Sequence, residues 1–307
     1  MDLSVIIPIY NEEGNIKTLL ARLKAVIDTM GLHSYEFIFI NDGSRDNSME
    51  IIRNIAAENK NVHYINLSRN FGHQIAVTAG LDKSTGDSVV IIDADLQDPP
   101  ELIPELYKKL KSGYEVVYAK RKSRQGEGFM KKVAAKLFYR ILAKMTSISI
   151  PVDTGDFRIV DHKIIEVLRR MPEQQKFLRG QISWIGFNQT YVEYDRDERY
   201  AGKTGYTYKK MIRLALDGIT SFSNFPLKIV TLAGFIVSGI SFIMILYALY
   251  SRFISRDYEP GWTSLMLTIL FLGGIQLIGI GIIGEYISRI SANLRNRPLY
   301  IIKESNI

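Results

Sequence analysis

Cysteine is absent from this chain of 307 residues, and histidine occurs only four times. The absence excludes a disulfide framework, a thiolate zinc site and a cysteine nucleophile, so any metal must be held by oxygen ligands or by the histidines. The sequence is not poor in hydrophobic residues, which make up 47% of the chain. The chain is therefore a folded protein, long enough for one or two domains with a buried core.

Two phosphate-binding motifs are missing as well. Neither GxxxxGK[ST] nor GxGxxG occurs between an expected strand and an expected helix, which argues against a P-loop ATPase and a dinucleotide-dependent oxidoreductase. The net charge of +7 is divided between residues 1–225 and residues 226–307 rather than gathered in one stripe. We therefore expect no nucleic-acid partner.

Charged residues are absent from two long apolar runs, Ile229–Ser251 and Pro260–Gly284. Each run exceeds the roughly 20 residues that a helix needs to cross a bilayer. We predict two transmembrane helices over about 229–251 and 260–284, and the alternative is a pair of buried helices in a soluble core.

Basic residues flank the two runs unequally. The connecting loop holds Arg252 and Arg256 beside two acids, whereas the outer flanks carry more basic residues: Lys209, Lys210, Arg213, Lys228, Arg289, Arg295, Arg297 and Lys303. By the positive-inside rule, both termini and the preceding domain are expected in the cytoplasm.

The first part of the chain alternates between β-branched runs and segments with a helical period. The expected strands are Leu3–Ile9, Glu36–Asn41, Val62–Leu67, Ser88–Asp93 and Glu115–Ala119. The expected helices are Asn15–Met30, Ser48–Asn59 and Pro100–Ser112. This alternation predicts an α/β fold with a mainly parallel sheet and helices on both faces.

Three parts follow from these patterns: an α/β domain over 1–205, an amphipathic segment over 206–225, and a membrane domain over 226–307. Within the second part, Thr207–Phe222 sets Lys209, Lys210 and Arg213 against an apolar face. The pattern favours a helix lying in the membrane interface, with an ordinary surface helix as the alternative.

Polar side chains follow four of the expected strands. They lie at the carboxyl ends of the strands, where parallel sheets bind their ligands. The sharpest pattern is Asp93-Ala94-Asp95-Leu96-Gln97, whose oxygen ligands suit Mg²⁺ or Mn²⁺ bridging nucleotide phosphates. Acidic pairs after strands are also common turn formers, so this motif alone leaves both readings open. Tyr10, Glu12 and Asp42 follow two other strands and offer a stacking ring and carboxylates for a nucleoside.

The order of motifs resembles a known family. The segments IPIYNEE, NDGS, SRNFGH, DADLQDPPEL, VDTGDFR and RYAGKTGY, followed by two apolar runs, are similar to family 2 glycosyltransferases that act on polyprenyl phosphates, especially bactoprenol glucosyl transferases. Relatives of this kind include dolichol-phosphate mannose synthase. The resemblance implies a GT-A fold, a UDP-sugar donor, a divalent metal, a polyprenyl-phosphate acceptor such as undecaprenyl phosphate, and inversion at the anomeric carbon.

The resemblance also implies roles for individual residues. It puts the nucleoside against Pro8, Tyr10, Glu12 and Asp42, with Asp93 near the ribose or the donor sugar. It puts the metal on Asp95 and Gln97 and phosphate contacts on Arg121 and Lys203, with Arg199 near the acceptor.

Two acids of the VDTGDFR segment compete for the catalytic role, and the resemblance points to Asp156. Asp153 is the second choice, and an Asx-turn is its ordinary structural role. Because the acceptor phosphate has a second pKa of about 6, Asp156 is expected to orient it or take its last proton rather than activate a weak nucleophile.

Alternatives remain for the chemistry. The acceptor could be a polymer or a protein, the donor could be GDP-mannose or another nucleotide sugar, or the chain could be a non-catalytic membrane adaptor or flippase subunit. Convergence of Asp42, Asp93, Asp95, Gln97, Asp156 and Arg158 disfavours the adaptor. The resemblance further implies a homo-oligomer, a tetramer, in a bacterial plasma membrane.

Overall fold

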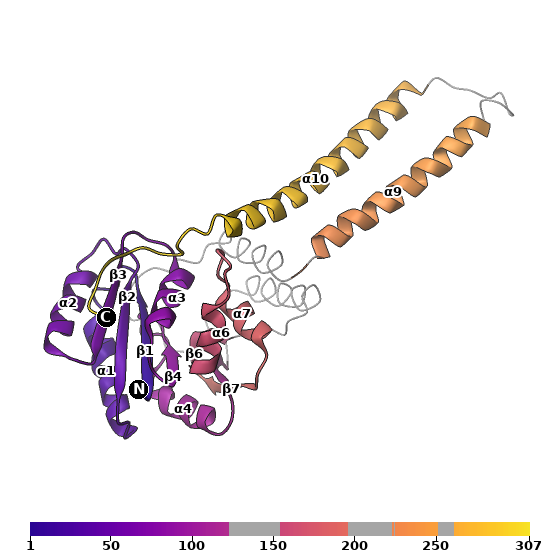
Figure 1. The fold of residues 1–307 in the computed structure, drawn as a ribbon. Helices are drawn as coiled ribbons and strands as arrows, with labels where there is room; N and C mark the ends of the chain where they lie inside the picture. Colours follow the sequence, from indigo (N-terminus) through magenta and orange to yellow (C-terminus); the bar gives the residue numbers. More distant parts are fainter. Residues whose placement is uncertain (123–153, 196–222, 224, 251–260) are drawn as a thin grey trace.

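The computed structural model describes residues 1–122, 154–195, 223, 225–250 and 261–307 (Figure 1). Within these residues one eight-stranded sheet has the order β7-β5-β6-β4-β1-β2-β3-β8. The strands are β1 (Leu3–Ile9), β2 (Tyr35–Asn41), β3 (Val62–Leu67), β4 (Ser88–Ile91), β5 (Val116–Arg121), β6 (Thr154–Asp161), β7 (Gln189–Tyr194) and β8 (Ile302–Ser305). Strands β1 to β4 are mutually parallel, whereas β6 lies antiparallel between β4 and β5.

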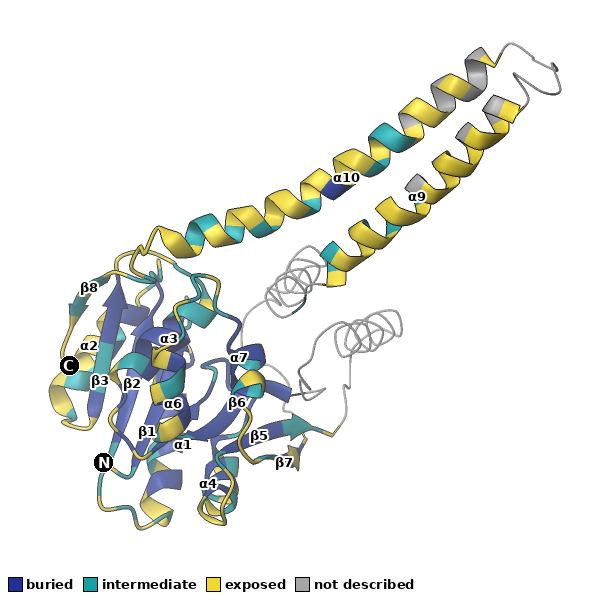
Figure 2. Cartoon of the chain, turned by 45° about the vertical axis from the view of Figure 1, so that its right-hand side comes forward, coloured by how far each residue is buried: buried dark blue, intermediate teal, exposed yellow. Residues whose placement is uncertain are grey.

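Helices cover both faces of the sheet because successive strand residues point to opposite sides. On one face α1 (Ile16–Thr29), α2 (Ser48–Glu58) and α4 (Ile103–Lys111) share a hydrophobic cluster with Phe37 and Phe39 of β2. On the other face α3 (His73–Lys83), α6 (His162–Arg169) and α7 (Leu178–Ile185) share a second cluster with Ile38 and Ile40. The buried side chains fill the centre of this domain (Figure 2). The predicted α/β fold is confirmed.

Most predicted elements lie within a few residues of their observed bounds. Strand β4 ends at Ile91 rather than at Asp93, because the chain leaves the sheet in the turn that carries the acidic motif. The segment predicted as one helix over Pro100–Ser112 begins with a 3₁₀ turn, η1 (Pro100–Leu102), before α4. Helix α3 and strands β6 and β7 had no specific prediction.

The C-terminal residues return to the sheet, which the sequence analysis did not anticipate. Strand β8 pairs antiparallel with β3, and Glu304 accepts hydrogen bonds from Arg53 and from Asn66 Nδ2, the latter at 2.8 Å. Before β8, the Tyr300 hydroxyl donates to Asp82 at the end of α3 at 2.9 Å. The tail therefore attaches the C-terminal helices to the catalytic domain.

Two long apolar helices, α9 (Phe225–Tyr250) and α10 (Trp262–Leu294), lie side by side and extend away from the sheet (Figures 1 and 2). Both are long and apolar enough to cross a membrane. Large side chains on them are exposed, such as Phe235 at 75% and Leu277 at 70%. Surface of this kind requires an apolar covering.

The helix bounds differ from the predicted spans. Helix α9 begins earlier than residue 229, and α10 continues past residue 284 to Leu294. This extension contains an ion pair in which Arg289 Nε lies 3.0 Å from Glu285 Oε1. The predicted interface helix over Thr207–Phe222 lies outside the described residues.

Gly86 provides a test of packing at the amino edge of the sheet. A Cβ at this position would lie 2.6 Å from the backbone nitrogen of Ser4 and 2.9 Å from the carbonyl carbon of Leu3. Because backbone cannot move aside like a flexible side chain, we expect Gly86→Ala to cost about 1–3 kcal/mol of unfolding free energy. The thermal midpoint in detergent should fall by several degrees. Gly14→Ala, where a Cβ meets nothing within 4 Å, is the matched control and should keep the wild-type midpoint.

Candidate functional site

The polar segments after β1, β2, β3 and β4 lie at the same edge of the sheet, as the parallel order requires. Cross-strand hydrogen bonds connect them. The backbone N–H of Asn11 donates to Ser44 Oγ at 3.0 Å, and Asn41 Nδ2 donates to Asn66 Oδ1 at 2.8 Å. Two non-glycine residues here, Asn11 and Leu96, have positive φ angles of 56° and 60°. Such backbone costs free energy, and its presence after two neighbouring strands is typical of a functional edge.

Asp42 anchors the loop that follows β3. Its carboxylate is buried and accepts the backbone N–H groups of Phe71 at 2.7 Å and Gly72 at 3.0 Å. Burial raises the pKa of Asp42, although both hydrogen bonds oppose the rise. The predicted contact of Asp42 with a nucleoside stays a prediction. In the structure this carboxylate fixes the residues immediately before α3.

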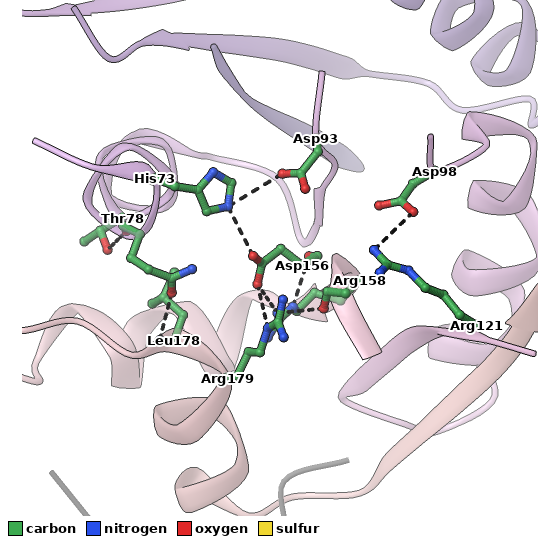
Figure 3. A network of polar contacts seen from close by, with 11 residues as sticks. His73, Thr78, Asp93, Asp98, Arg121, Asp156, Arg158, Leu178 and Arg179 are labelled. Atoms are coloured by element: carbon green, nitrogen blue, oxygen red, sulfur yellow. Dashed lines mark hydrogen bonds and ion pairs between the residues drawn. The ribbon is translucent and has the colours of Figure 1, made fainter. Parts of the chain in front are cut away.

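The first residue of α3 is His73, and its ring lies between two carboxylates (Figure 3). Its Nε2 atom is 3.2 Å from Asp156 Oδ2 and 3.6 Å from Asp93 Oδ1. Burial lowers the pKa of His73, but the charges of Asp93 and Asp156 outweigh that effect and raise it to about 9. The ring is therefore an imidazolium at neutral pH.

Asp156, the acid predicted as catalytic, lies on β6 and is surrounded by cations (Figure 3). Its Oδ1 accepts from Arg158 Nη2 at 2.8 Å and from Arg179 Nε at 3.0 Å, while Oδ2 faces His73. Burial raises the pKa of Asp156, but Arg179, His73 and Arg158 together hold it well below its ordinary value. This carboxylate is anionic and a weak base.

Asp93 lies close to Asp156, because both carboxylates approach the same nitrogen atom of His73. Strand β6 pairs with β4 so that Arg158 is opposite Ile91, the last residue of β4, which brings the two acids to the same end of these strands. Burial and the carboxylates of Asp156, Asp98 and Asp95, opposed by His73, raise the pKa of Asp93 to about 6. The edge therefore concentrates negative charge that a cation would offset.

Asp98 and Arg121 form a second contact near the same acids (Figure 3). Arg121 Nη2 lies 3.8 Å from Asp98 Oδ1, and its Nε donates to the Tyr194 hydroxyl at 3.3 Å. The Tyr194 hydroxyl in turn donates to the buried Asp98 carboxylate. Arg121, predicted to contact phosphate, is thus held at the end of β5 with about a quarter of its side chain exposed.

The predicted metal ligands lie in the turn after β4. Asp95 is buried, and its Oδ1 accepts the backbone N–H of Gln97 at 3.2 Å. Among the described residues no three His, Asp or Glu side chains come together as a metal site. A carboxylate with an amide oxygen nevertheless fits Mg²⁺ or Mn²⁺ when substrate phosphates and water complete the shell.

The residues predicted to bind the nucleoside lie at the end of β1 or just beyond it. Pro8 is buried inside the strand, whereas the Tyr10 ring is 46% exposed and available for stacking. Glu12 accepts a hydrogen bond from Asn15 at 2.6 Å. Contact of these residues with a nucleoside stays a prediction. Asp153, Arg199 and Lys203 lie outside the described residues.

Sequence reasoning missed His73, Arg179 and Asp98 as parts of this site. His73 lies inside the quoted SRNFGH segment and Asp98 inside DADLQDPPEL, so the motifs themselves were the available signal. Arg179 comes from α7 in a segment without a motif. Only the packing of α7 beside β6 brings its guanidinium to Asp156.

Comparison with known proteins gives the family. Residues 4–169 match the family model described as glycosyl transferase family 2. The chain belongs to this family. Residues 225–290, which contain α9 and most of α10, match the GtrB C-terminal hairpin. The first match lies in the sheet domain, and the second lies in the helical hairpin.

Family 2 relatives match along the whole chain. The uncharacterized glycosyltransferase YkcC of Bacillus subtilis is 50% identical over 98% of this chain and 93% of its own length. The SfII prophage-derived bactoprenol glucosyl transferase of Shigella flexneri is 42% identical over 100% of this chain and 99% of its own length.

The fold of this chain is also similar to that of a solved structure. Glucosyl-3-phosphoglycerate synthase of Mycobacterium tuberculosis, crystallised with Mn²⁺, UDP-glucose and phosphoglyceric acid, has a TM-score of 0.50 and 19% identity. The match covers 71% of this chain and 77% of that one. At this identity it shows the shared GT-A fold alone.

Gly43 tests the contact between the loops after β2 and β3. Its φ is +67°, and a Cβ would lie 2.6 Å from the backbone carbon of Arg69 and from the backbone nitrogen of Asn70. We expect the overlap in Gly43→Ala to lower the unfolding free energy by about 1–3 kcal/mol. This loss adds to the cost of placing alanine at a positive φ angle. The measurement is the thermal midpoint, which should fall.

Gly31→Ala is the matched control, because its φ of +62° is similar and a Cβ there meets nothing within 4 Å. Equal losses in the two variants would contradict the loop contact.

Proposed function

We propose that this chain transfers glucose from UDP-glucose to undecaprenyl or another polyprenyl phosphate, with inversion at the anomeric carbon. The observation that carries the proposal is the full-length similarity to the bactoprenol glucosyl transferase of Shigella flexneri, which spans both the catalytic domain and the hairpin. An acidic edge surrounded by histidine and arginine cations supports it, because the reaction brings together two phosphate-bearing substrates.

The donor diphosphate is proposed to lie beside the turn after β4. Asp95 and Gln97 would hold Mg²⁺ or Mn²⁺, which supplies positive charge to the departing diphosphate when bound. Asp93 would face the ribose or the sugar. Tyr10, with its exposed ring, and Glu12 would contact the nucleoside, together with Pro8 and Asp42.

The acceptor phosphate is proposed to attack the anomeric carbon through one of its own oxygens, while the bond from that carbon to the diphosphate breaks. Asp156 is a poor base, because three cations hold its pKa low. We therefore assign it an orienting role: it fixes Arg158, Arg179 and His73 in place. Arg121 and Lys203 are proposed to contact phosphate, with Arg199 near the acceptor, and Asp153 stays the second choice for the catalytic acid.

Helices α9 and α10 are proposed to cross a bacterial plasma membrane. A polyprenyl tail stays in the bilayer, so anchoring the catalytic domain at its surface removes the need to extract the tail into water. Lys228 in the first turn of α9, with Arg295 and Arg297 after α10, favours cytoplasmic termini. A homo-oligomer, and specifically a tetramer, stays a proposal from the resemblance.

The direct test is transfer of radiolabelled glucose from UDP-glucose to undecaprenyl phosphate by the purified full chain in detergent. Label should enter the lipid phase, stop with EDTA and return with added Mn²⁺ or Mg²⁺. Label that moves equally well in EDTA would contradict the metal assignment. If no label is transferred from UDP-glucose but another nucleotide sugar is used, the assignment of UDP-glucose as the donor is wrong.

Asp95→Asn tests the metal ligand. We expect transfer to fall on the order of 10²- to 10³-fold, because the substitution removes charge that stabilises the leaving group indirectly through the metal. The measurement is the initial rate at saturating Mn²⁺. Asp28→Asn, on the exposed face of α1, is the matched control and should keep the wild-type rate. A near wild-type rate for Asp95→Asn would contradict the assignment of Asp95 as a metal ligand.

A further inference from the structure

His73 joins two parts of the site that come from different strands. Its Nε2 atom is the point of contact for both carboxylates, at 3.2 Å from Asp156 on β6 and 3.6 Å from Asp93 after β4 (Figure 3). A single ring nitrogen thus faces both acids. The side chain is still 40% exposed, so the ring borders the surface on which substrates would arrive.

The backbone before His73 is held in place independently of the ring. Asp42 accepts the N–H groups of Phe71 and Gly72, and Gly72 has a φ of +102°. The next residue, Gln74, accepts the backbone N–H of Leu178 through its side-chain oxygen at 3.1 Å. The start of α3 is therefore fixed from the β2 side and from α7, which carries Arg179.

The charges facing His73 come from every element packed against it. Asp93, Asp156 and Asp42 favour its protonated form, while Arg179 and burial oppose it. The acids prevail and raise the pKa of His73 to about 9. The Asp156 charge also raises the pKa of Asp93. A cation that lies between two carboxylates reduces the repulsion between their charges.

We propose that His73 is a positioning residue for the sugar transfer: its ring bridges Asp93 and Asp156, offsets their negative charges as an imidazolium, and sets their separation before substrates bind. The proposal rests on the proposed function. The ring acts through the two acids and moves no proton in the reaction. Its loss should reduce turnover more than donor binding, because misplacement of reacting groups by about 1 Å can cost on the order of 10²-fold in rate.

Three variants test the bridge by steady-state kinetics in detergent. His73→Gln keeps a hydrogen-bond donor but no charge, and we expect kcat to fall roughly 30- to 100-fold while KM for UDP-glucose changes less than about threefold. His73→Lys restores a cation and should recover part of kcat. His33→Gln, at an exposed histidine after α1, is the matched control and should keep the wild-type kcat.

The pH profile separates a charge bridge from a merely structural role. Rising pH removes the imidazolium proton, so wild-type kcat should fall as the pH passes about 9. In His73→Lys that alkaline limb should move to higher pH, since an ammonium loses its proton later. A His73→Gln variant with kcat within twofold of wild type, or an unchanged alkaline limb in His73→Lys, would overturn the proposal.

A titration without substrates distinguishes this proposal from the proposed function. In the full chain labelled at histidine, the NMR signal that disappears in His73→Gln reports the ring. We expect its pKa well above 6.5 in the wild type, and at least one unit lower in Asp156→Asn. A ring that titrates at or below 6.5 overturns the bridge. A wild-type chain that transfers no sugar counts against the proposed function, while the titration still supports or overturns the bridge.

Discussion

The contact of Asp156 with three cations is the interaction around which the site is organised. Its two oxygens meet Arg158 from the same strand, Arg179 from α7 and His73 from α3. An unpaired carboxylate in this position would be costly, because burial disfavours its charge. The pairing therefore fixes the two helices relative to β6. It also leaves Asp156 anionic, and an anion with bound cations can orient phosphate-binding groups more readily than it can accept a proton.

A second constraint acts at the neighbouring strand ends. The Asp42 carboxylate accepts hydrogen bonds from two backbone N–H groups, and Gly43 lies against the backbone after β3. These contacts determine where α3 begins. Because His73 is the first residue of that helix, a local arrangement of backbone far from Asp156 decides whether the imidazolium reaches it. The segments that look like separate motifs in the sequence are thus one connected unit.

The hairpin connects this unit to an apolar environment. Helices α9 and α10 leave their large side chains exposed, while the C-terminal residues return to the sheet as β8 and bind Arg53 and Asn66 through Glu304. Within the hairpin, the Tyr286 hydroxyl of α10 donates to the carbonyl of Ser223, just before α9, at 2.6 Å. The catalytic domain contacts α10 directly, since the Gln174 backbone N–H donates to Asn293 Oδ1 at 3.0 Å. Attachment of this kind suits a protein whose acceptor would remain in a bilayer.

Local periodicity by itself determined the strands β1 to β5, the helices α1, α2 and α4, and the two long apolar helices, since alternation and the helical period depend only on neighbouring residues. A motif after a strand identified Asp93 and Asp95, and the family resemblance pointed to Asp156. The tertiary structure alone decided their partners. Strand β6 inserts antiparallel between β4 and β5 and so brings Asp156 to the end of β4 that Asp93 follows, and α7 supplies Arg179 from a segment without a motif. Neither the insertion of β6 nor the pairing of β8 with β3 leaves a local pattern, because sheet order is set by long-range packing rather than by residue spacing.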